Sequence, residues 1–219
     1  MIAGITLKVC GLTTVADAQS AADCGADYIG FNLYPPSPRY LPLEQYKSFS
    51  ARLPALEKVA IIGSPTAAEL AVAAAAGFDR FQVHFPLETA VAVVGSWAET
   101  VGVSRLWLAP KLPPADDVPA ALLPFAETFM LDTFHAGGFG GSGKTGDWAK
   151  FARHALRHEE KTWILAGGLN PDNIAVAVTR SGARFVDVNS GVESAPGVKD
   201  EAKLGRFVGA LRDAAARRR

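Results

Sequence analysis

Residues 162–191 read TWILAGGLNPDNIAVAVTRSGARFVDVNSG, an apolar run followed by a helical pattern and a second apolar run. The first run, Thr162–Ala166, predicts a buried strand because it is short and rich in β-branched and aromatic side chains. Pro171–Ser181 predicts a helix that begins near a proline and ends just before Gly182. Arg184–Asn189 predicts the second strand. A strand, a helix and a strand in this order indicate two parallel strands joined by a right-handed crossover.

The same alternation extends along the whole chain. Eight short apolar runs predict strands: Ile5–Cys10, Tyr28–Leu33, Lys58–Ile62, Arg80–Phe85, Arg105–Ala109, Thr128–Asp132, Thr162–Ala166 and Arg184–Asn189. Helical patterns lie between them: Thr14–Cys24, Leu43–Leu53, Thr66–Ala76, Pro171–Ser181 and Glu201–Ala216. Eight such units favour a closed (β/α)8 TIM barrel of the α/β class, with parallel strands, over an open doubly wound sheet. No linker interrupts the series, so we expect residues 1–219 to form a single barrel domain.

Composition excludes several classes of partner. The chain has 219 residues, of which 49% are hydrophobic and 20% charged, and 22 basic side chains balance 22 acidic ones. Such a balance predicts no attraction to nucleic acid or to an anionic membrane. Cys10 and Cys24 are too few for a disulfide framework, and the N-terminus lacks the pattern of a signal peptide. We therefore expect a cytoplasmic protein with no membrane segment.

Residues 138–145, GFGGSGKT, match the G-x-x-x-x-G-K-[ST] pattern of a phosphate-binding P-loop. That pattern requires a strand that runs directly into its first glycine, whereas the predicted strand ends near Asp132. We interpret residues 137–143 as part of a loop whose five glycines allow it to fold over a bound substrate, or as a plain solvent-exposed loop. ATP binding is not expected.

Polar or glycine-rich residues follow several of the predicted strands. In a (β/α)8 barrel the loops at the carboxyl ends of the strands assemble the active site, so these residues are candidates for it. These short sequence motifs, called phrases below, are Lys8–Gly11, Ser37–Arg39, Asp132–Thr133 with Gly140–Gly143 and Asp147–Trp148, Leu165–Asn173, and Asp187–Glu193 with Gly197–Asp200.

In this order, the phrases resemble those of the phosphoribosylanthranilate isomerase family of tryptophan biosynthesis, and they extend from residue 8 to residue 200. Two positions depart from the family pattern: Phe85 stands where the fourth strand usually ends in Gly, and Gly146 replaces an aromatic residue. The resemblance implies an aldose–ketose isomerase that performs an Amadori rearrangement of N-(5′-phosphoribosyl)anthranilate to 1-(2-carboxyphenylamino)-1-deoxyribulose 5-phosphate.

That reaction needs one acid and one base, and no metal or organic cofactor. The resemblance implies that Asp132 protonates the ring oxygen of the sugar and that Cys10 removes the proton from the adjacent carbon. Taken alone, each residue has a plainer interpretation: Cys10 as a small buried hydrophobe and Asp132 as a turn or cap. Lys8 shares the barrel face of Cys10 by strand alternation, so its charge is expected to favour the thiolate. We interpret Cys24 as a residue that contributes to helix packing.

The two ends of the substrate have separate candidate sites. Gly167, Gly168, Ser190 and Gly191 follow the seventh and eighth strands, where barrels of this type bind phosphate, although plain tight turns explain glycines equally well. Arg39 is the candidate for the anthranilate carboxylate, with an ordinary surface ion pair as its alternative. His84 has no second His or Cys at metal spacing, so we interpret it as structural.

Two other functions stay open at this stage. One is a different phosphosugar-processing barrel enzyme, which would share the phosphate loops but use another acid and base. The other is a noncatalytic barrel that binds a phosphate ligand. The sequence leaves the oligomeric state, the kinetic constants and the breadth of substrates undetermined.

Overall fold

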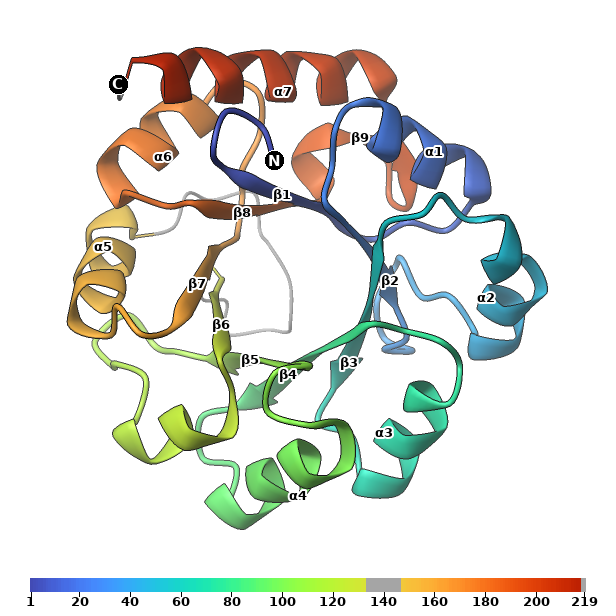
Figure 1. Cartoon of the computed structure of the whole chain (residues 1–219), viewed down its shortest axis with the longest axis vertical. Coiled ribbons are helices and arrows are strands. Elements are labelled where there is room, and N and C mark those ends of the chain that lie inside the picture. The colour runs from blue at the N-terminus through green and yellow to red at the C-terminus, as the bar shows by residue number, and fades with distance from the viewer. Residues whose placement is uncertain (133–146, 218–219) are drawn as a thin grey trace.

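Eight parallel strands pair in chain order and close into a barrel in the computed structural model, which describes residues 1–132 and 147–217 (Figure 1). The strands are β1 (Thr6–Val9), β2 (Tyr28–Asn32), β3 (Glu57–Gly63), β4 (Arg80–Pro86), β5 (Leu106–Lys111), β6 (Thr128–Leu131), β7 (Thr162–Leu165) and β8 (Phe185–Val188). Pairing of β1 with β8 closes the barrel and sets Lys8 opposite Asp187. The predicted (β/α)8 architecture is confirmed.

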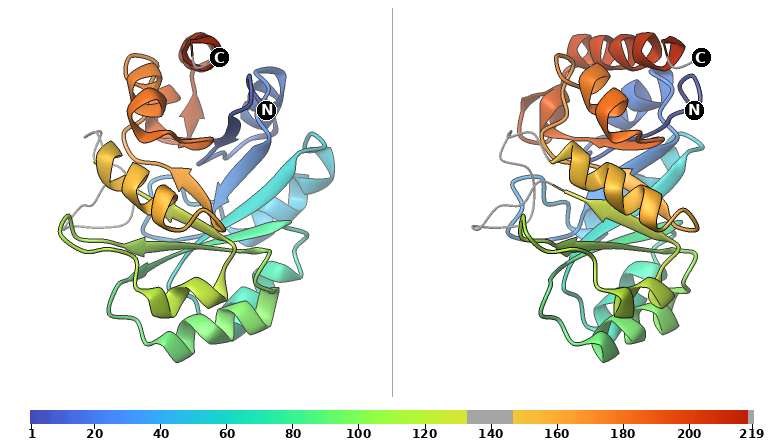
Figure 2. Two further views of the ribbon diagram at one scale, coloured as in Figure 1. Left: turned by 60° about the vertical axis from the view of Figure 1, so that its left-hand side comes forward. Right: turned by 90° about the vertical axis from the view of Figure 1, so that its left-hand side faces the viewer.

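The helices surround the barrel (Figure 2). They are α1 (Val15–Asp23), α2 (Leu43–Phe49), α3 (Ala67–Ala74), α4 (Val91–Val101), α5 (Trp148–Arg157), α6 (Ile174–Ser181) and α7 (Glu201–Ala216). Local chemistry fixes their ends: Thr66 and Glu69 form a capping box at α3, and Gly182 ends α6 in the left-handed conformation. The helices predicted from the sequence are all present, shorter by up to a few residues at their ends.

The crossover from β5 to β6 departs from the regular pattern. It contains a 3₁₀ helix, η2 (Ala120–Phe125), with Pro124 inside it, in place of an α-helix. Proline lacks the backbone N–H that an α-helix interior requires, which explains the shorter, tighter element. The described residues contain two further 3₁₀ turns, η1 (Ser50–Arg52) after α2 and η3 (Ser190–Val192) after β8. A small antiparallel hairpin of β9 (Glu193–Ala195) and β10 (Val198–Lys199) then precedes α7.

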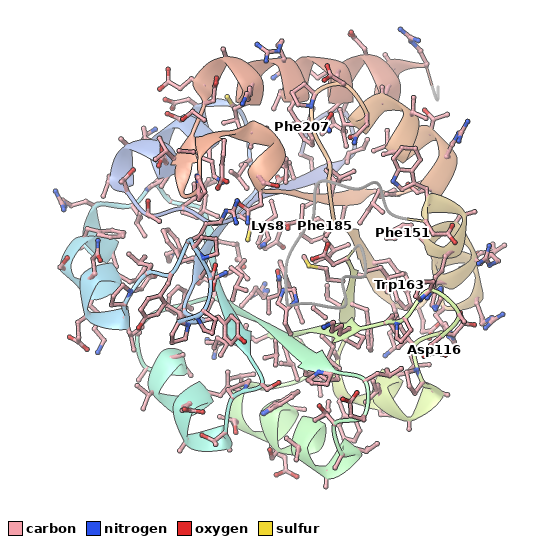
Figure 3. All side chains as sticks on the ribbon, turned by 180° about the vertical axis from the view of Figure 1, so that it is seen from behind. Lys8, Asp116, Phe151, Trp163, Phe185 and Phe207 are labelled. Atoms are coloured by element: carbon pink, nitrogen blue, oxygen red, sulfur yellow. The ribbon has the colours of Figure 1, made fainter. Side chains whose placement is uncertain are left out.

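Aromatic side chains fill one part of the barrel interior. Tyr28 stacks on Phe185 with their ring centroids 5.2 Å apart, and Trp107 meets both rings edge-on. A second, larger core lies between the strands and the helices and includes Phe151 of α5 and Phe207 of α7. Figure 3 shows Lys8 and Phe185 near the middle of the barrel and Phe207 at α7. The aromatic packing supports the strands that carry the polar residues described next.

Candidate active site

A pocket lies at the carboxyl ends of the strands, where the barrel loops converge. Its lining includes Cys10 directly after β1 and residues from the loop after β2, from β4, and from the ends of β6, β7 and β8. Six of the predicted site residues line it together: Cys10, Arg39, Asp132, Gly167, Gly168 and Ser190. They come from five separate stretches of the chain, and the closed barrel is what brings them to one cavity.

Lys8, Cys10 and Asp187 form a buried group that we call the Lys8 cluster. The Lys8 side chain is wholly buried, and its Nζ donates a 2.7 Å hydrogen bond to Oδ1 of Asp187. Gly30 on the neighbouring strand leaves space for this side chain, because a Cβ there would lie 3.0 Å from Lys8 Cε. Cys10 borders the pocket two residues after Lys8.

The charge state of Cys10 results from opposing effects. Burial raises the pKa of the Cys10 thiol, while the positive charge of Lys8 and a hydrogen bond with it work in the opposite direction. Burial is the larger effect, so the pKa lies above that of an ordinary thiol. The charge of Lys8 therefore opposes the effect of burial on the Cys10 pKa without outweighing it.

Gln82 and His84 of β4 line the same pocket. Gln82 Nε2 lies 2.7 Å from Nε2 of His84, and burial, with a smaller contribution from the charge of Lys8, lowers the pKa of His84 to about 4. The imidazole is thus neutral at physiological pH. Among the described residues no group of three His, Cys, Asp or Glu side chains is placed to hold a metal ion.

Phe85, one of the two departures from the family pattern, faces away from the pocket. Its ring is fully buried and meets the ring of Trp97 in α4 edge-on, with centroids 5.3 Å apart. Strand alternation explains this, since Gln82 and His84 face the interior and Phe85 therefore faces the helices. Phe85 thus packs in the outer layer and is not part of the pocket lining. Gly146, the other departure, lies outside the described residues.

Asp132 directly follows β6 and borders the pocket. The P-loop-like segment, residues 138–145, lies outside the described residues, as does the rest of 133–146. The strand before that segment ends at Leu131, as the sequence predicted to within one residue. Asp147 caps α5 by accepting a hydrogen bond from the backbone N–H of Lys150.

Backbone geometry shapes the loops after β7 and β8. Gly167 and Gly168 have φ values of 87° and 64°, which favour glycine, and Asn173 Nδ2 donates a 2.8 Å hydrogen bond to the carbonyl of Gly168. Ser190 begins η3, and the first N–H groups of such a turn have no partner within it. Together the two loops offer small residues and backbone donors at one side of the pocket.

Gly191 differs from the other three candidates for phosphate binding, because it is not part of the pocket lining. A Cβ at this position would collide with the carbonyl oxygen of Leu169 and come within 2.8 Å of the Asn170 Cβ. Glycine is therefore required for the close packing of the β8 loop on the β7 loop. Direct contact between Gly191 and the phosphate remains a prediction.

Arg39, Glu193 and Lys199 form a second charged group, the Arg39 cluster. Arg39 donates to both oxygens of Glu193, from Nε at 2.9 and 3.0 Å and from Nη2 at 2.6 Å. Lys199 Nζ donates to Glu193 Oε1 at 2.8 Å and to Asn189 Oδ1 at 3.0 Å. The predicted candidate Arg39 is thus at the pocket, held there by a buried carboxylate rather than by a surface ion pair.

The sequence analysis missed the partners of these groups. Asp187, Glu193 and Lys199 all stand in phrases that carried the family resemblance, but their roles depend on contacts across the barrel. The signal in the sequence was the position of Asp187 in the eighth strand, since closure of the barrel places the first and eighth strands side by side. Nothing in the local sequence pairs Arg39 with Glu193.

The fold and this pocket define a (β/α)8 barrel enzyme site suited to a small anionic ligand. The family model for N-(5′-phosphoribosyl)anthranilate (PRA) isomerase matches residues 7–210. The chain belongs to this family.

Individual relatives agree with that assignment. N-(5′-phosphoribosyl)anthranilate isomerase from Magnetococcus marinus is 38% identical over 213 residues, which cover 96% of each chain. The crystal structure of TrpF from Jonesia denitrificans aligns with a TM-score of 0.77 and 36% identity, covering 96% of this chain and 98% of that one. A phosphoribosyl anthranilate isomerase solved in complex with reduced 1-(o-carboxyphenylamino)-1-deoxyribulose 5-phosphate aligns with a TM-score of 0.75 and 27% identity, covering 95% and 99%.

Proposed function

We propose that this chain isomerises N-(5′-phosphoribosyl)anthranilate to 1-(2-carboxyphenylamino)-1-deoxyribulose 5-phosphate, with Asp132 as the acid and Cys10 as the base. Membership of the isomerase family of tryptophan biosynthesis supports the reaction. The observation that carries the assignment of roles is that Cys10 and Asp132, from strands on different parts of the barrel, border one pocket. A reduced form of the product is bound by a relative of known structure, which supports a phosphosugar as the ligand.

The two proton transfers use groups of this chain. Asp132 in its protonated form gives a proton to the ring oxygen of the ribose, and the ring opens to an iminium ion at the anomeric carbon. Cys10 as a thiolate takes the proton from the adjacent carbon, which leaves an enolamine that tautomerises to the aminoketose. Lys8 lies beside Cys10 and favours the thiolate through its charge, against the effect of burial.

The substrate carries a negative charge at each end. At one end, the loops that contain Gly167, Gly168 and Ser190 offer backbone N–H groups to the phosphate. At the other end, Arg39 binds the ring carboxylate through its guanidinium. Fixing both ends holds the reacting carbon between acid and base, which converts binding energy into orientation.

Further properties follow from this function as proposals. We propose a cytoplasmic enzyme that acts on a small-molecule phosphosugar, with neither nucleic acid nor membrane as a partner. Balanced charge across the chain supports this. In the part of the chain that the structure describes, none of the helices is long and apolar enough to cross a membrane.

The test is a steady-state assay of the purified chain on N-(5′-phosphoribosyl)anthranilate, followed by loss of its fluorescence and by identification of the aminoketose. We expect turnover without added metal or cofactor. Turnover of a different phosphosugar, with none on this substrate, would favour another barrel enzyme. Binding of phosphate ligands without turnover of any of them would favour the noncatalytic alternative.

A further inference from the structure

The guanidinium of Arg39 has two edges, and Glu193 occupies one of them. The three hydrogen bonds from Nε and Nη2 to Glu193 define the lateral edge. The terminal edge, made of Nη1 and the second hydrogen of Nη2, forms no hydrogen bond with any described residue. An Arg fork binds a carboxylate bidentately through either edge, so a second carboxylate has a place at the terminal one.

The charges of the Arg39 cluster do not balance. Two cations, Arg39 and Lys199, share the single carboxylate of Glu193, whose side chain is 4% exposed. Although burial alone would raise the pKa of Glu193, the hydrogen bond from Arg39 and the charge of Lys199 hold it below the ordinary value. Glu193 is therefore ionised, and with Arg39 and a protonated Lys199 the cluster carries one positive charge in excess; burial lowers the pKa of Lys199, and the charge of Glu193 opposes that shift. An incoming carboxylate would compensate that charge.

The stem of Arg39 is also fixed. Ser37 Oγ accepts a hydrogen bond from the backbone N–H of Arg39 at 3.1 Å. Gly11, with φ of 71°, lies against the side chain, and a Cβ there would come within 2.8 Å of Arg39 Cδ. The side chain is thus confined along its stem by Gly11 and at its head by Glu193.

We propose that Glu193 is a positioning residue that occupies the lateral edge of Arg39 and so reserves the terminal edge for the aryl carboxylate of the substrate. The inference rests on the proposed function, and it assigns to Glu193 a role in selecting substrates that carry this carboxylate. Glu193 itself touches neither the substrate nor the reacting atoms. Without its charge, the guanidinium turns away from the geometry that a bidentate contact needs.

The experiment measures kcat/KM of the full chain on two substrates, the natural one and the analogue that lacks the ring carboxylate. Their ratio is the selectivity for the carboxylate, and general damage to the fold cancels from it. We expect Glu193→Gln to lower this ratio about tenfold or more, mostly through a higher KM for the natural substrate, because the amide cannot accept all three bonds. Arg39→Lys measures the full selectivity that Arg39 supplies.

A second pair of variants covers the case in which Glu193→Gln fails to fold. Gly11→Ala places a Cβ 2.5 Å from Asn189 Oδ1, which accepts a hydrogen bond from Lys199 of the same cluster, and 2.8 Å from Arg39 Cδ, so it displaces both. Gly77→Ala introduces a side chain at a similar positive φ, 85°, with no atom within 4 Å of the new Cβ. The proposal predicts a reduced selectivity ratio for Gly11→Ala and an unchanged ratio for Gly77→Ala.

Two results would overturn the proposal. One is a selectivity ratio that stays at the wild-type value in Glu193→Gln, or in Gly11→Ala if the first variant does not fold, while Arg39→Lys lowers it. The other is a wild-type enzyme that turns over both substrates equally well. A wild-type chain that converts neither substrate would instead refute the proposed function, so the two failures are distinguishable.

Discussion

The Lys8 cluster and the Arg39 cluster are both buried ion pairs at one pocket, yet they differ in their balance of charge. In the Lys8 cluster one lysine faces one aspartate, and Cys10 is a neutral thiol beside them. In the Arg39 cluster two cations face one glutamate. A balanced pair satisfies its own charges, whereas an unbalanced group at a pocket attracts an anion.

This difference separates two tasks within one cavity. The Lys8 cluster contains the proposed base, Cys10, and the charges of Lys8 and Asp187 adjust the protonation of its thiol. The Arg39 cluster lies in the loops, where a charge holds a ligand. The variants below are chosen to disturb one cluster or the other, and they are arranged by the size of the expected effect.

The largest effect is expected at the acid and the base. Cys10→Ala and Asp132→Asn should each lower kcat by about 10² to 10⁴-fold, because each removes a group that transfers a proton. Circular dichroism should show an unchanged fold. If either variant turned over at close to the wild-type rate, the role assigned to that residue would be wrong.

Removal of a buried lysine should affect stability very differently in the two clusters. Lys8→Met leaves Asp187 buried without its partner, so we expect a loss of about 3 to 5 kcal/mol in the free energy of unfolding. Lys199→Met is the matched control, since both lysine side chains are wholly buried but Glu193 keeps its bonds from Arg39. Urea unfolding should show a clearly smaller loss of unfolding free energy for Lys199→Met than for Lys8→Met.

A double variant checks the reason for this loss. Lys8→Met combined with Asp187→Leu removes both charges, and we expect it to recover most of the stability, because an apolar pair of similar volume replaces a buried ion pair at little cost. Equal losses in Lys8→Met and Lys199→Met would contradict the difference in charge balance between the clusters.

The neutrality of His84, which lies near Lys8, should appear in the pH dependence of stability. The unfolded chain binds a proton at this histidine below about pH 6.5, whereas the folded chain does so only near pH 4. The unfolded state therefore binds more protons in this window, and stability present above pH 6.5 is lost as the pH falls through 4. The contribution is about 3 kcal/mol.

The measurement compares urea unfolding of the wild type and of His84→Gln between pH 7 and pH 4. Carboxylates titrate in both proteins, so the difference between the two curves isolates His84. We expect the wild type to lose more stability than the variant over this range. Parallel curves would show that the histidine is protonated equally in the folded and unfolded states.

A smaller effect is expected from the head group of Arg39. Arg39→Lys keeps the charge but loses the fork, and we predict a loss of about 1.5 to 3 kcal/mol in transition-state stabilisation, seen in kcat/KM. With the analogue that lacks the ring carboxylate, the variant and the wild type should be similar. The same loss with both substrates would mean that Arg39 contacts another part of the ligand or acts through structure.

The sequence predicted the fold because each βα unit carries its own local signals. These signals set the bounds of strands and helices within a few residues, so they are visible without the structure; examples are the apolar runs, the capping residue Thr66 and Gly182. No helix was predicted in the crossover after β5, and the structure has a 3₁₀ helix there, because Pro124 is incompatible with an α-helix interior.

Less of the site could be predicted, because its partners are far apart in the chain. Hydrogen bonds join Lys8 to Asp187 across 179 positions and Arg39 to Glu193 across 154. Only closure of the barrel in a particular register creates such pairs. Likewise, the glycine at position 191 is typical of a phosphate-binding loop, but its close packing on the Leu169 carbonyl already requires a glycine there. The balance between burial and charge at Cys10 also depends on tertiary structure.

The most direct test of the division between the clusters is the affinity for reduced 1-(o-carboxyphenylamino)-1-deoxyribulose 5-phosphate, the ligand bound by a relative of known structure. Isothermal calorimetry would give its Kd for the wild type, Cys10→Ala and Arg39→Lys. Our account predicts that Cys10→Ala binds as the wild type does, while Arg39→Lys binds about tenfold or more weakly. Unchanged binding by Arg39→Lys, or an equal loss in Cys10→Ala, would contradict it.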